Sequence, residues 1–136
     1  DMNFTTKGWV NDCIIVLKKH QGFGLAGPIN NNPRILTQAF VSRRHMEIFG
    51  WFFPEEILNW CCDDWYNWVY HPSYVYVLKQ HYCANVGGQP RYIIDNNVDF
   101  HKSQVLLAKK TKELREKTMK LAMQHKTIIV NYVKDN

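Results

Sequence analysis

The chain has 136 residues, of which 46% are hydrophobic and 14% aromatic, and it carries 17 Lys and Arg residues against 12 Asp and Glu residues. A domain of this length buries roughly 68% of the surface that its unfolded chain exposes, so it can hold a core without disulfides or a structural metal. This composition excludes a disordered or fibrous chain. No apolar run approaches the ~18 residues of a membrane-spanning helix, so we expect no membrane span. The four cysteines form no C-x-x-C pair, so we expect no zinc site.

The excess positive charge lies at the C-terminal end of the chain. Residues 1–96 hold eight Lys and Arg and eight Asp and Glu, whereas residues 97–136 hold nine and four. Such a basic segment can attract an anionic partner, or it can be the solvated face of a helix. Aromatic residues gather elsewhere, between residues 49 and 76. Because proteins that bind single-stranded nucleic acid interleave aromatic and basic residues along a groove, this segregation argues against nucleic acid as a partner.

The N-terminal third predicts a helix, a loop and a strand. Apolar residues recur at three- and four-residue spacing after Thr5 or Thr6, either of which can cap a helix that ends near Gln21. Three glycines and an Asn-Asn-Asn-Pro run predict a long loop over residues 22–33. Residues 34–41 alternate as a strand with two mostly apolar faces. A strand buried on both sides favours a mixed sheet covered by helices over a two-sheet sandwich.

The middle of the chain predicts short helices. Ser42 can cap a helix over residues 43–49, which a glycine then ends. Asp63 or Asp64 is well placed to cap another helix over residues 65–70, before a proline.

Two further strands and a long basic helix complete the predicted elements. Residues 75–83 and 91–94 read as strands separated by a Gly-Gly turn, a helix covers about 96–124, and the run 127–133 has a β-rich composition. We expect one α/β domain over residues 1–136. The chain opens with Asp-Met-Asn-Phe, which is neither an initiator Met nor a targeting segment, so we also expect it to be a fragment of a longer protein.

The acidic pair Asp63-Asp64 lies between Trp60 and Trp65. Two carboxylates among indole rings are costly unless they cap a helix, bind a cation or act as bases. A carboxylate beside apolar rings can be tuned to accept a proton from a hydroxyl group, and an indole can stack on a sugar ring. This combination favours carbohydrate chemistry. The alternative is that one acid only caps the helix while the other points to water.

Several longer stretches carry a family pattern. They are DMNFTTKGW at residues 1–9, RILTQAFVSRRHMEIFG at 34–50, FFPEEILNW at 52–60, CDDW at 62–65 and GGQPRY at 87–92. Over residues 1 to about 95 this pattern resembles the C-terminal, acceptor-side half of nucleotide-sugar glycosyltransferases with the A-type fold. The resemblance implies that residues 96–136 form an added helix and tail. It also implies that the nucleotide-binding half of the fold is absent from this chain, so that half, or a second copy of the chain, is an expected partner.

The resemblance further implies a reaction and a set of residues for it. A sugar would pass from a nucleoside diphosphate-sugar donor to a hydroxyl group of a glycan or other acceptor, helped by Mg²⁺ or Mn²⁺. Asp64 would be the base and Asp63 its helper. Asp1 and His81 would be metal ligands, although a lone His on a strand is more often a structural residue.

Four residues are candidates for substrate binding. Trp60 and Trp65 flank the acids and could stack on a sugar, and Gln38 lies in the Thr-Gln stretch of the family pattern. Arg91 follows the Gly-Gly turn, and a guanidinium group can bind the oxygens of a leaving diphosphate. The alternative function is a module without chemistry that binds a glycan or polyanion through the aromatic cluster and the basic helix.

Overall fold

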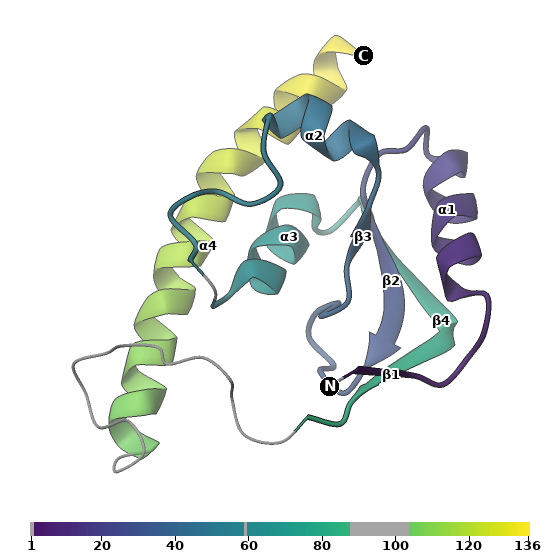
Figure 1. The fold of residues 1–136 in the computed structure, drawn as a ribbon. Coiled ribbons are helices and arrows are strands. Elements are labelled where there is room, and N and C mark those ends of the chain that lie inside the picture. The colour runs from purple at the N-terminus through teal and green to yellow at the C-terminus, as the bar shows by residue number, and fades with distance from the viewer. Residues whose placement is uncertain (1, 59, 88–103) are drawn as a thin grey trace.

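A computed structural model of the chain describes residues 2–58, 60–87 and 104–136, and within them the fold is mixed α/β (Figure 1). The strands are β1 (Met2–Phe4), β2 (Leu25–Asn30), β3 (Phe40–Val41) and β4 (Val75–Asn85). The helices are α1 (Trp9–Lys19), α2 (Arg43–Phe49), α3 (Cys62–Tyr70) and α4 (Gln104–Asp135). The predicted α/β class and the long C-terminal helix are confirmed. None of the described helices is long and apolar enough to span a membrane.

The four strands form one mixed sheet in the order β1-β4-β2-β3. At its centre β2 and β4 run parallel, with Leu25 opposite Val75, and β1 and β3 pair antiparallel with them on the two edges. A parallel pair is normally covered on both faces. Here α1 covers one face, while α3 and α4 lie on the other (Figure 1).

The alternation of side chains along β2 divides the core in two. Leu25 packs in an aromatic cluster with α3 and α4, and the next residue, Ala26, packs against Cys13 and Leu17 of α1. Both Leu25 and Ala26 are completely buried. The sheet is therefore anchored on both faces, and α3, which carries the acidic pair, is fixed against its larger core.

The prediction of a loop over residues 22–33 and a strand over residues 34–41 is wrong. The central strand β2 falls within the first segment, and the second contributes only the two residues of β3. The glycine content suggested a loop, but Gly27 lies within the strand because the backbone of Gln38 packs closely against it. A Cβ at this position would lie 2.3 Å from the carbonyl oxygen of Gln38. The predicted strand over residues 91–94 lies outside the described residues.

The predicted N-terminal cap is wrong for α1 and correct for α2. Neither predicted threonine caps α1; Gly8, with φ 82°, precedes the helix, and Thr6 contacts His81 instead. For α2 the prediction is confirmed, because the Ser42 hydroxyl oxygen accepts a hydrogen bond from the backbone N–H of Arg44 at 3.1 Å.

The last two helices extend further than the sequence predicts. α3 begins after Cys61, which has φ 68°, so Asp63 and Asp64 lie in its first turn rather than at the cap. Carboxylates there still interact favourably with the helix dipole. α4 continues through the β-rich run 127–133, because Ile129 is buried at 2% exposure in the larger core. Packing of an apolar helix face outweighs the weak strand preference of these residues.

Candidate functional site

The two neighbouring acids of α3 lie in different surroundings. Asp63 borders a cavity of about 340 Å³. Its described walls are Thr37, Ala39, Phe52, Phe53, Cys62 and Tyr66. Burial raises the pKa of Asp63, and the negative charge of Asp64 raises that pKa further. Asp63 is therefore a carboxylate with increased proton affinity at the edge of an aromatic-walled space.

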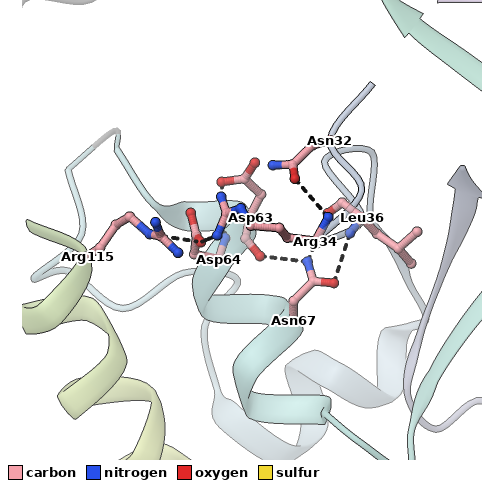
Figure 2. Close-up of polar contacts among 7 residues, drawn as sticks. All are labelled: Asn32, Arg34, Leu36, Asp63, Asp64, Asn67 and Arg115. Atoms are coloured by element: carbon pink, nitrogen blue, oxygen red, sulfur yellow. Dashed lines mark hydrogen bonds and ion pairs between the residues drawn. The ribbon is translucent and has the colours of Figure 1, made fainter. Parts of the chain in front are cut away.

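Asp64 is held between two arginines. Its Oδ1 atom lies 3.7 Å from Nη1 of Arg34 and 3.6 Å from Nε of Arg115, and the residue is only 6% exposed (Figure 2). Within the described residues, Asp64 Oδ1 and Arg115 Nε are both buried and make no hydrogen bond. Asp64 is thus engaged in ion pairing with groups from a loop and from α4.

Asn67 fixes the loop after β2 against α3 (Figure 2). Its Oδ1 accepts a hydrogen bond from the backbone N–H of Leu36 at 2.9 Å, and its Nδ2 donates to the carbonyl oxygens of Leu36 at 2.9 Å and Asp63 at 2.8 Å. The side chain is buried, so it satisfies backbone groups that water cannot reach. This clamp determines where the loop lies relative to the acidic pair.

Asparagine side chains also shape the loop that carries Arg34. Asn30 Nδ2 donates to the carbonyl oxygen of Ile35 at 3.1 Å, and Asn30 Oδ1 accepts from the backbone N–H of Asn32 at 2.7 Å. Asn32 Oδ1 in turn accepts from the backbone N–H of Arg34 at 3.0 Å. These local bonds turn the chain so that the Arg34 guanidinium reaches Asp64.

The predicted sugar platforms differ in their surroundings. The structure places Trp65 in the core rather than on a binding surface: it is 0% exposed, and its Nε1 donates to Nδ1 of His125 at 3.2 Å. Its ring is packed by Phe49 and Trp51 among others, so no face is open to a ligand. Trp60 is half-buried, and its indole N–H has no partner among the described residues.

The two remaining candidates for substrate binding are Gln38 and Arg91. Gln38 does not line the Asp63 cavity, although its chain neighbours Thr37 and Ala39 do. Its Oε1 accepts a hydrogen bond from the hydroxyl group of Thr37 at 2.7 Å, and its Nε2 donates to Met2 Sδ at 3.5 Å. Arg91 lies outside the described residues.

His81 is a buried residue whose ring contacts two half-buried polar side chains. Its Nε2 lies 2.7 Å from Asp12 Oδ2, and its Nδ1 lies 2.7 Å from Thr6 Oγ1. The bond with His81 lowers the pKa of Asp12. Asp1, the other predicted ligand, lies outside the described residues, and within residues 2–58, 60–87 and 104–136 no three His, Cys, Asp or Glu side chains group to hold a metal ion. Both ring nitrogens of His81 have protein partners in this arrangement, so a metal ion would have to displace Thr6 or Asp12 from the ring, and the metal site stays a prediction.

The sequence alone did not identify the partners of the acidic pair. Asn67 could have been predicted as a partner, since it lies four residues after Asp63 and therefore on the same face of a helix. Arg115 had no such signal, because its contact with Asp64 exists only once α4 packs on α3.

Comparisons of the chain with protein-family models, with curated proteins and with solved structures found no match.

Proposed function

We propose that this chain is the acceptor-side part of a nucleotide-sugar glycosyltransferase. The observation that carries the proposal is the position of Asp63, a carboxylate of raised pKa at a cavity with aromatic walls. The raised pKa suits a general base, whose efficiency grows as its pKa approaches the working pH. The aromatic walls provide the apolar surface that a sugar ring needs.

Within the acidic pair, the surroundings favour Asp63 as the base and Asp64 as its partner, the reverse of the roles implied by the resemblance. Asp64 Oδ1 is buried beside Arg34 and Arg115, so a substrate hydroxyl would have to displace an ion pair to reach it. Asp63 instead borders free space. The charge of Asp64 raises the pKa of Asp63, and the positive charge of Arg34 opposes this to a smaller extent.

The proposed step is a proton transfer coupled to glycosyl transfer. Asp63 takes the proton of an acceptor hydroxyl group while the hydroxyl oxygen bonds to the anomeric carbon of the donor and the nucleoside diphosphate leaves with the electrons of the broken bond. The donor, and any Mg²⁺ or Mn²⁺, would be bound by the nucleotide-binding half of the fold that the resemblance implies.

The test is glycosyl transfer by the full-length protein, assayed with a panel of labelled nucleotide-sugars and hydroxyl acceptors. Asp63→Asn should reduce kcat at least about 100-fold, which is the lower bound for losing a general base. The matched control Glu47→Gln, which neutralises an exposed carboxylate on α2, should stay within about twofold.

Two outcomes contradict the proposal in different ways. If Asp64→Asn abolishes transfer and Asp63→Asn does not, the roles within the pair are wrong. If no donor is turned over but glycans bind, the chain belongs to a binding module instead.

A further inference from the structure

A second cavity lies on the other side of the Asn67 clamp. It has a volume of about 590 Å³ and is bounded by the loop after β2, the C-terminal end of α3 and the exposed ends of β2 and β4. Its apolar surface includes Ile29, Val75 and Val77, and Trp68 and Arg34 lie beside them. None of its lining residues borders the Asp63 cavity. The volume is in the range of small-ligand sites.

Trp68 connects this space to a third cavity, of about 440 Å³, between α3 and α4. Lys112, Arg115 and Glu116 of α4 line that cavity. The half-buried indole of Trp68 therefore stands between two open spaces, with one arginine in each.

The two arginines have binding capacity that the fold does not use. Arg34 and Arg115 are 49% and 40% exposed at their side chains, and both approach the same oxygen of Asp64 at distances too long for a hydrogen bond. Each guanidinium group has five N–H donors in a planar fork. Glu116 is the one acidic residue among the described residues lining the two cavities, and it is paired with Lys112 at 4.0 Å. When Asp64 is counted with Glu116 against Arg34, Lys112 and Arg115, the charge around Trp68 is still positive.

We propose that Arg34, Trp68 and Arg115 form a binding site for a sugar ring that bears an anionic group, such as a phosphate or a carboxylate. The indole and the aliphatic side chains would contact the apolar face of the ring, and the guanidinium forks would bind the anion through paired hydrogen bonds. Asn32 also lines the cavity, and its Nδ2, which none of the loop hydrogen bonds described above uses, would donate to a ring hydroxyl group. This site goes beyond the proposed transfer reaction, because binding there needs neither a donor nor Asp63.

The test is equilibrium binding by calorimetry, with glucose 6-phosphate, glucuronate, glucose and inorganic phosphate as separate probes of the full-length protein. Glucose 6-phosphate or glucuronate should bind at least tenfold more tightly than glucose and than inorganic phosphate. The first comparison isolates the anion, the second isolates the ring, and the preference between the two anionic sugars identifies the charged group. Equal binding of glucose or of inorganic phosphate would overturn the proposal.

Variants separate this site from general attraction to the basic helix. Arg34→Gln and Trp68→Leu should each raise the Kd of the preferred sugar about tenfold, and Arg34→Lys should have a smaller effect because it keeps the charge but loses the fork. The matched control Lys117→Gln removes an exposed charge from α4 and should change Kd less than twofold. Equal losses in Arg34→Gln and in the control would refute the site. Circular dichroism of each variant establishes that the fold is intact, and because Arg34 is half exposed its substitution does not create a cavity in the core.

Discussion

The Asn67 clamp makes the sharpest prediction about stability. Asn67→Ala removes three hydrogen bonds and leaves the backbone N–H and C=O of Leu36, which is 4% exposed, without their partner. Each buried backbone group left unpaired costs about 1–3 kcal/mol. Alanine recovers up to about 0.7 kcal/mol through its higher helix propensity. We therefore expect the free energy of unfolding to fall by about 3 kcal/mol.

The assay is urea denaturation followed by tryptophan fluorescence, with a control for the propensity contribution. Asn11→Ala is the matched variant, because Asn11 is an exposed asparagine within α1. It should leave stability unchanged or raise it by a few tenths of a kcal/mol. A loss below about 1 kcal/mol in Asn67→Ala would refute the reasoning, since it would mean that water or a rearranged loop satisfies the Leu36 groups.

Two further predictions concern buried titratable groups. Burial raises the pKa of Cys13 to about 11, so iodoacetamide at about pH 8 should alkylate its thiol far more slowly in the native protein than in urea. Mass spectrometry of the labelled peptide measures the two rates, and equal rates would contradict the prediction. Burial lowers the pKa of His45, so the unfolded chain binds more protons below the ordinary value of about 6.5, and stability should fall as the pH drops from about 7 to 5.5. His45→Gln should flatten that dependence in parallel urea titrations, and an unchanged slope would show that other groups cause it.

Elements whose structure is determined by residues close in the sequence were predicted correctly, and those determined by tertiary contacts were not. The Ser42 cap and β4 were predictable, because a serine before a helix and an alternating run are read within a few residues. The strand β2 was not, because its glycine, alanine and proline are buried by partners from α1, β3 and β4 rather than by their own composition. Local propensity is a weak prior where tertiary contacts decide.

The same distinction applies to the candidate site. Asp63 and Asp64 could be selected from the sequence because two carboxylates between tryptophans are costly to bury unless they have a partner or a function. The difference between their surroundings could not be predicted, because it depends on Arg34 from a distant loop and Arg115 from α4. Trp65 was misassigned because an aromatic residue next to an acid looks the same in sequence whether it lines a pocket or fills a core.

A carboxylate whose pKa is raised by burial lowers the stability of the protein when it ionises, and for Asp63, the proposed base, this effect can be measured. Because the pKa of Asp63 is raised in the folded state, ionisation of this carboxyl group opposes folding. Below the unfolded-state pKa of about 3.9 the group is protonated in both states and its ionisation costs no stability. As the pH rises from there through the folded-state pKa, the protein loses stability. Asp63→Asn should therefore increase the free energy of unfolding near neutral pH, and the gain should shrink as the pH approaches about 3.5. If Asp63 mainly stabilised the first turn of α3 through the helix dipole, the same variant would destabilise the protein instead. Urea titrations of wild type and variant at the two pH values distinguish these cases, because removing a carboxylate whose ionisation is penalised by burial raises stability, whereas removing one that stabilises the helix lowers it.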